Sequence, residues 1–166
     1  MNMRLGLNRS LPACVAALAM CLSLPAGAAT CSLSATGLNF GVYDLVNAIS
    51  STSSITLSCS RSLGEFGNRR IPYQIELSTG GGSYAAREMV NGTSIMRYNL
   101  YADATRTAVW GDGTGGSVPV DGILRIPPFA LSEQTEHTVY GMVFPNQGDL
   151  ESGTYFSSPI TVIVSY

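Results

Sequence analysis

A single histidine and one pair of carboxylates are the residues of this chain that could carry acid–base chemistry. His137 is the only histidine, and it lies at the start of an apolar run. With one histidine, and with a cysteine pair expected to be oxidised, neither a Ser-His-Asp nor a Cys-His arrangement can be assembled. Glu133 and Glu136 resemble a glycosidase pair, whose carboxyl groups face each other across a cleft. Because they lie in the polar stretch Ser-Glu-Gln-Thr-Glu-His, we interpret them as part of a solvated loop and expect no enzyme.

The glycine-rich segment 111–116, Gly-Asp-Gly-Thr-Gly-Gly, resembles a phosphate-binding loop only in its glycine content. It lacks the Lys-Ser/Thr end with which such loops reach phosphates, so a turn between strands is the better interpretation. Asp112 alone cannot hold calcium, which takes about six to eight oxygen ligands. Asp103 and Asp121 would be the other candidates, but nothing in their spacing requires a shared site. We therefore expect neither a metal nor another cofactor.

Residues 1–29 are predicted to be an export signal that is not part of the fold. Arg4 and Arg9 form a positive start, and an apolar run follows from residue 11 to residue 24. This length is typical of a signal peptide and is too short for a membrane-spanning helix, which needs about 20 apolar residues. Small residues follow, and we expect cleavage after Ala28 or Ala29. No membrane insertion is expected of the remaining chain.

Residues 30–166 then form one exported domain with a mildly acidic surface. Two of the nine arginines leave with the signal and the chain has no lysine, so seven basic side chains remain against 11 acidic ones. This balance argues against nucleic acids and anionic membranes as partners. The length is sufficient for one hydrophobic core.

Two of the four cysteines lie in the predicted signal, which leaves Cys31 and Cys59. In an exported domain two cysteines most simply form one disulfide, and two free buried thiols are the alternative. By the chain-entropy model the bond would contribute roughly 3–4 kcal/mol.

The rest of the chain predicts strands rather than helices. Short alternating runs lie between clusters of Gly, Ser, Asn and Pro, and no convincing helical spacing is present. Residues 96–102, for example, place Tyr98 and Leu100 on one face and Asn99 and Tyr101 on the other. The clearest runs are 38–43, 55–59, 71–77, 96–102, 139–144 and 160–166. Six or seven strands of this kind predict an all-β, two-sheet sandwich with Greek-key links.

The last run, 160–166, is uncharged and strongly β-prone. Its inward residues would be Ile160, Val162, Val164 and Tyr166. Two interpretations are open: an interior strand that is fully paired within the domain, or a strand next to a gap, where another chain can add a strand.

Several short motifs lie in a characteristic order between Cys31 and Tyr166. The most specific is Tyr98-Asn99-Leu100-Tyr101-Ala102-Asp103 with Trp110-Gly111-Asp112-Gly113-Thr114. The others are Cys31 with Leu38-Asn39-Phe40-Gly41-Val42-Tyr43-Asp44, then Ile55-Thr56-Leu57-Ser58-Cys59, Thr138-Val139-Tyr140-Gly141 and Gly153-Thr154-Tyr155. Together they resemble the spore coat protein U domain, a family that includes pilins of archaic chaperone–usher pili.

This resemblance implies an immunoglobulin-like sandwich that lacks its last strand and has a disulfide between Cys31 and Cys59. It implies that a periplasmic chaperone first supplies the missing strand, and that the amino-terminal extension of another pilus subunit later replaces it. The incoming strand would pair beside Ile160, Val162, Val164 and Tyr166. The implied partners are the chaperone, an outer-membrane usher and other pilus subunits. The implied route leads through the periplasm to the cell surface or an extracellular fibre.

The chain departs from the shaft-pilin pattern in its predicted amino terminus. A donor extension has roughly ten residues before the first cysteine, whereas cleavage after Ala28 or Ala29 leaves one or two. This favours a subunit at the fibre tip, which accepts a strand and donates none. A rival cut after Ala19 would leave an extension in which Met20, Leu22 and Leu24 alternate.

A free-standing secreted adhesin or carbohydrate-binding module is the alternative from another functional class, and a coat-type structural protein is a third interpretation. In a binding module, loop-borne apolar residues would contact the target, because exposed apolar patches mark contact sites. Trp110, Phe129 and Leu131 are the candidates.

Overall fold

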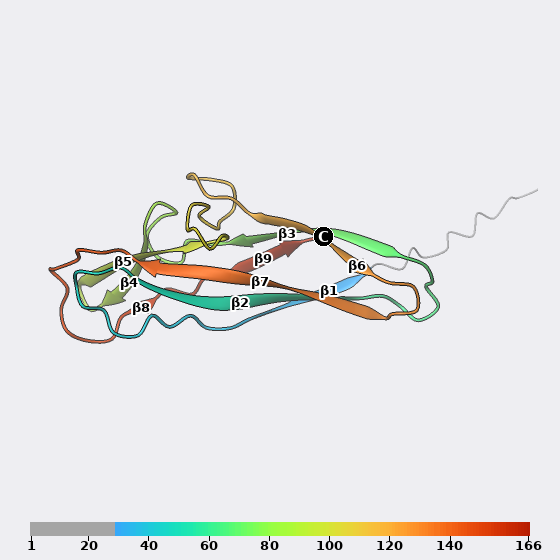
Figure 1. Cartoon of the computed structure of the whole chain (residues 1–166), viewed down its shortest axis with the longest axis horizontal. Coiled ribbons are helices and arrows are strands. Elements are labelled where there is room, and N and C mark those ends of the chain that lie inside the picture. The colour runs from blue at the N-terminus through green and yellow to red at the C-terminus, as the bar shows by residue number, and fades with distance from the viewer. Residues whose placement is uncertain (1–28) are drawn as a thin grey trace, which may run out of the picture.

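The computed structural model describes residues 29–166, which form two β-sheets and contain no helix (Figure 1). The larger sheet has the strand order β1-β2-β7-β5-β4-β8, and the smaller sheet has the order β6-β3-β9. The strands are β1 (Thr30–Ala35), β2 (Ile49–Ser60), β3 (Arg69–Leu77), β4 (Arg87–Asn91), β5 (Ser94–Tyr101), β6 (Val120–Ile126), β7 (Ser132–Val143), β8 (Phe156–Ser157) and β9 (Val162–Ser165). The predicted all-β, immunoglobulin-like two-sheet sandwich is confirmed.

The predicted signal and its cleavage site fall on residues 1–29, of which 1–28 lie outside the described residues. Within residues 29–166, no helix has the length and the apolar character that crossing a membrane requires.

Strands β2 and β7 form the spine of the larger sheet. They pair antiparallel over 12 residues, from Ile49 opposite Val143 to Ser60 opposite Ser132. Successive side chains of a strand point to opposite faces, so every second residue at the end of β2 points inward. Leu57, in the middle of that run, is fully buried.

Trp110 links the two sheets at the centre of the core. It is fully buried. Its backbone N–H donates to the Leu100 carbonyl of β5 at 2.9 Å, and its indole Nε1–H donates to the Ile75 carbonyl of β3 at 2.9 Å. A buried tryptophan usually satisfies its single N–H in this way.

Arg87 of β4 is fully buried beside Trp110. Its Nη1 donates to Asn99 Oδ1 at 2.6 Å, and its Nη2 donates to the carbonyls of Trp110 at 2.7 Å and Ser78 at 3.1 Å, while its Nε has no partner. Burial lowers the pKa of Arg87. We call Trp110, Arg87 and Asn99 together the Trp110 junction.

The predicted strand at 38–43 is wrong, because within residues 29–166 this segment has no strand to pair with. Leu38 and Phe40 do alternate inward, and they pack directly on β7 at Gly141. A Cβ added at Gly141 would lie 2.8 Å from Leu38 Cδ1, so only glycine leaves room for the approach. The first strand is instead β1, whose small and polar residues gave little apolar signal.

The second half of β5 is buried on both faces. Asn99 and Tyr101 are both buried, although they alternate with the inward residues Tyr98 and Leu100. The chain around Tyr84 covers this side, since Asn99 Nδ2 donates to the Tyr84 carbonyl at 2.7 Å. Both faces of β5 are therefore covered from Tyr98 to Tyr101, whereas Ile95 and Arg97 nearer its start are exposed.

Candidate functional site

An open groove lies between the chain that follows β1 and the chain that leads into β9. The segments 35–40 and 157–162 form its walls, and its volume is about 220 Å³. Its floor consists of buried core side chains, among them Leu100 and Val139. A second hollow of about 660 Å³ adjoins it and shares Phe40 with it. The domain is therefore open along this side, where its core side chains form the floor.

One border of the groove is β9, which lies at an edge of the smaller sheet. It pairs with β3 only, from Leu77 opposite Val162 to Gln74 opposite Ser165, and its other edge has no partner strand among the described residues. Val162 and Val164 are half-buried and pack on the core, whereas Ile163 between them is 50 % exposed. Val162 and Val164 thus face inward and Ile163 outward, whereas Tyr166, which was also expected to face inward, is exposed.

The structure brings two of the four predicted partner-strand residues into the groove. Ile160 and Val162 line it. Val164 packs on the core beyond the groove lining. Tyr166 lies at the end of β9 and is 56 % exposed.

The other border is β1 and the segment after it, which runs along one long side of the molecule (Figure 1). Strand β1 pairs with β2 only. Within the described chain, residues 37–43 form no backbone–backbone hydrogen bond. Unpaired backbone N–H and C=O groups beside an apolar hollow are a template for an added strand.

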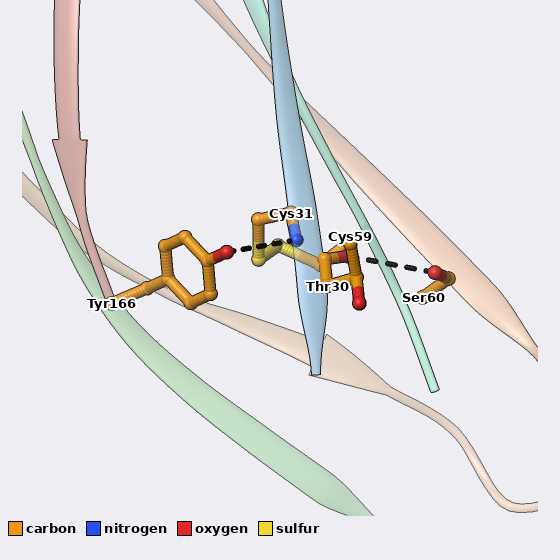
Figure 2. Close-up of a disulfide and its surroundings, with 5 residues drawn as sticks. All are labelled: Thr30, Cys31, Cys59, Ser60 and Tyr166. Atoms are coloured by element: carbon orange, nitrogen blue, oxygen red, sulfur yellow. Dashed lines mark hydrogen bonds between the residues drawn. A yellow bond between two sulfur atoms is a disulfide. The ribbon is translucent and has the colours of Figure 1, made fainter. Parts of the chain in front are cut away.

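The predicted disulfide is confirmed, and it fixes β1 to the sheet. Cys31 and Cys59 are direct cross-strand partners in the β1–β2 pair, with a Cα–Cα distance of 4.0 Å. Figure 2 shows Tyr166 reaching from the end of β9 to this bridge, where the Cys31 N–H donates to the Tyr166 hydroxyl at 3.3 Å. The start of β1 and the end of β9 are therefore adjacent.

His137 has a packing role in β7. Its Nε2 lies 2.9 Å from the Tyr73 hydroxyl, and its ring stands edge-on to Trp110 at 6.3 Å. Burial lowers the pKa of His137, which keeps the ring neutral at pH 7. The predicted loop around Glu133 and Glu136 is wrong: both lie on β7, where their side chains are exposed. No group of three metal-ligating side chains occurs in the part of the chain that the structure describes.

The glycine-rich segment 111–116 is a turn, as predicted. The Asp112 carboxylate accepts from the Thr114 N–H at 2.9 Å and from the Thr114 hydroxyl at 2.6 Å. These bonds lower the pKa of Asp112, with the Thr114 hydroxyl as the largest cause. The Asp112 carboxylate therefore stabilises the turn.

Of the apolar residues predicted for a binding module, Trp110 is wrongly placed, because it is fully buried. Phe129 is 86 % exposed and Leu131 is exposed as well. Their loop is held by Arg61, a buried residue that we did not predict: its guanidinium donates to the carbonyls of Gly67, Pro127 and Ala130 at 2.6, 2.9 and 2.7 Å. Nothing in the local sequence separates this arginine from a surface arginine.

The fold and the groove define a class: a disulfide-linked β-sandwich with one open side. The family model of the Spore Coat Protein U domain matches residues 16–162, and the chain belongs to this family. The resemblance inferred from the motifs is therefore confirmed. The search of curated proteins gave no match.

One similar solved structure is the crystal structure of the CsuC–CsuE complex, a chaperone with a tip adhesion subunit before assembly, from the archaic chaperone–usher Csu pili of Acinetobacter baumannii. The sequence identity is 18 % and the TM-score is 0.48, with 84 % of this chain and 40 % of that chain covered. The chain thus spans less than half the length of that structure's chain.

Proposed function

We propose that this chain is a structural subunit of an extracellular bacterial fibre of the archaic chaperone–usher type, and that its groove accepts a β-strand from another chain. The observation that carries the proposal is the groove between two unpaired edges, those of β1 and β9, with core side chains as its floor. Membership of the Spore Coat Protein U family supports it. The domain is then incomplete by itself.

A strand in the groove would contribute on the scale of a whole domain's stability. It would bond to the free backbone edges and cover the apolar walls with alternate side chains. Each Å² of apolar area removed from water contributes about 25 cal/mol, so covering a few hundred Å² contributes on the order of 5–10 kcal/mol. A domain's net stability is about 5–15 kcal/mol. Ile160 and Val162 would contact the added strand, and Val164 and Tyr166 would flank its end.

The partners in this proposal are a periplasmic chaperone, which supplies the first strand, an outer-membrane usher and other pilus subunits. The chain passes through the periplasm and ends in a fibre at the cell surface. Its role is structural, and no catalytic step is assigned to it.

The proposed place in the fibre is the distal tip. Cleavage after Ala28 or Ala29 leaves one or two residues before Cys31, and these cannot form a donor strand. Amino-terminal sequencing of the exported protein tests this. A start at Ala29 or Thr30 agrees with the tip, whereas a start at Met20 gives a shaft subunit with its own donor strand.

A free-standing binding module is the second candidate, favoured by the exposed apolar loops at 61–68 and 127–131. Leu63, Phe66 and Phe129 are each more than 80 % exposed. Arg61 holds the two loops together through carbonyls in both. A module of this kind would fold alone and need no strand from another chain.

Expression of residues 30–166 alone and with a fused strand distinguishes the fibre subunit from the free-standing binding module. The fibre proposal predicts aggregation or partial unfolding of the isolated domain, and rescue by a chaperone or by an alternating apolar strand fused after Tyr166. A fused strand of equal length made of Gly and Ser is the control and should not rescue. A soluble, monomeric and cooperatively folded isolated domain would exclude the acceptor role and leave the binding module.

A further inference from the structure

Tyr98 lines the groove, and its buried side-chain hydroxyl has no hydrogen-bond partner among residues 29–166. The described residues contain three buried side-chain nitrogen or oxygen atoms without a hydrogen-bond partner, and of their residues only Tyr98 lines the groove. Tyr98 lies on β5 and is 3 % exposed. A buried hydroxyl that makes no hydrogen bond is destabilising, so a group that reaches it from the groove would be bound favourably.

The ring of Tyr98 is held in place by its neighbours. Phe40 packs edge-on against it, with ring centroids 5.8 Å apart, and Arg87 lies opposite on β4. Burial raises the pKa of Tyr98, so its hydroxyl keeps its proton and acts as a donor at neutral pH. Ser157 of β8 lines the same groove, and its hydroxyl lies near enough to that of Tyr98 to lower the pKa as a hydrogen-bonding group, but the pair does not have the geometry of a hydrogen bond. The proton of this hydroxyl is therefore available, and an acceptor side chain placed in the groove would satisfy it.

We propose that the strand that occupies the groove carries one uncharged acceptor side chain, of Ser, Thr or Asn, at the inward position over Tyr98, while its other inward side chains are apolar. This rests on the proposed strand-acceptor function and specifies its partner. The acceptor is a side chain because the backbone groups of an added strand point sideways, towards the flanking edges, whereas its alternate side chains point to the floor. A carboxylate at this position is disfavoured, because the groove floor includes the apolar side chains of Leu100 and Val139.

The test uses the full chain with an alternating strand of about nine residues, a common strand length, fused after Tyr166. Since β9 ends just before Tyr166 and, among the described residues, pairs with β3 only, a short turn would return such a strand antiparallel along its other edge. The inward positions are Val in the reference, and each is changed in turn to Thr, which has the same shape with one methyl replaced by a hydroxyl. Denaturant titration gives the unfolding equilibrium constant of each exported fusion.

We expect Thr to be preferred at one inward position and disfavoured at the others. In the Tyr98→Phe background this preference should disappear, with a coupling of roughly 5- to 10-fold in the unfolding equilibrium constant, the size of one hydrogen bond. Tyr73→Phe is the matched control. The Tyr73 hydroxyl lies 2.9 Å from His137 Nε2, and Tyr73 does not line the groove. This substitution should leave the preference for Thr unchanged.

Two outcomes overturn the inference. If Val strands stabilise the chain but no position prefers Thr, or the preference survives Tyr98→Phe, the acceptor side chain is wrong while the strand-acceptor function stands. If no fused strand stabilises the chain at all, both the acceptor side chain and the strand-acceptor function are wrong.

Discussion

Trp110 and Val162 both pack against the core, but the chain surrounds them to different degrees. Trp110 is fully buried and bonds to a strand of each sheet. Val162 is half-buried, on a strand that has a partner on one side only. The Trp110 junction is completed by residues of this chain, whereas the groove beside Val162 has a floor and walls but no strand across it.

The difference indicates that stability in this domain has two sources. Contacts at the Trp110 junction form whenever the chain folds. Contacts along the groove form only when a second chain is present, so their contribution depends on that partner and its concentration. Substitutions in the two regions should therefore respond differently to an added strand.

The largest effect is expected at the junction. Trp110→Ala should lower the free energy of unfolding by roughly 3–5 kcal/mol, because it leaves a large cavity and removes the hydrogen bond from the indole N–H to the Ile75 carbonyl. The loss should be the same for every fused strand that stabilises the chain. Denaturant titration measures it, with Trp110→Phe as the milder control. A loss that varies with the fused strand would show that the two regions are not independent.

Removal of the disulfide should have the next largest effect. It spans 28 residues of sequence and holds β1, which borders the groove. Changing Cys31 and Cys59 together to Ser should cost roughly 3–4 kcal/mol. Unfolding with and without reductant checks this: reductant should destabilise the natural chain and leave the double variant unchanged. Mass spectrometry without reduction should show the two cysteine peptides linked, and free alkylation of both thiols in periplasmic protein would contradict the bond.

A charge on the groove face of β9 should cancel the contribution of an added strand. Val162→Asp places a carboxylate among apolar side chains, and we expect it to remove about 2–3 kcal/mol of the stabilisation given by a fused strand. Ile163→Asp is the matched control, since its side chain is 50 % exposed on the opposite face. Equal losses from the two changes would place the added strand elsewhere.

The smallest effect is a dependence on pH through His137. Burial lowers the pKa of His137 below its ordinary value of 6.5 in the folded protein. The unfolded chain then binds the proton more readily, so this contribution to stability is complete above about pH 6.5 and decreases as the pH falls below it. We expect less than about 1 kcal/mol between pH 7 and pH 5, because the side chain is partly exposed. His137→Gln should remove this part of the pH dependence, and an unchanged profile would contradict it.

Alternation in the sequence predicted the strands whose partners lie within the chain. Residues 55–59 and 71–77 alternate, and both lie in strands with one buried face. The alternation at 38–43 is equally real, since Leu38 and Phe40 point inward, yet no strand forms. A strand needs a neighbour for its backbone, and the sequence of one chain does not state whether that neighbour is present.

The buried arginines mark a second limit of local sequence patterns. Arg61 and Arg87 are buried because carbonyl groups distant in the sequence converge on their guanidinium groups. Arginine is almost never fully buried unless it is paired, so composition alone favours the surface. Trp110 directly precedes a glycine-rich turn, which favours an exposed loop, yet its side chain is fully buried. In all three cases tertiary contacts decide the environment.

Hydrogen exchange along β9 and residues 37–43 tests the central claim most directly, because it reports backbone pairing residue by residue. It compares the chain carrying the alternating strand with the chain carrying the Gly and Ser strand. The account predicts that the alternating strand slows exchange of the β9 amides that do not bond to β3 and of amides within 37–43, and that amides between β2 and β7 slow only as far as global stability rises. Slow exchange at the free edge of β9 without any added strand, or stabilisation by the strand with that edge still exchanging fast, would contradict it.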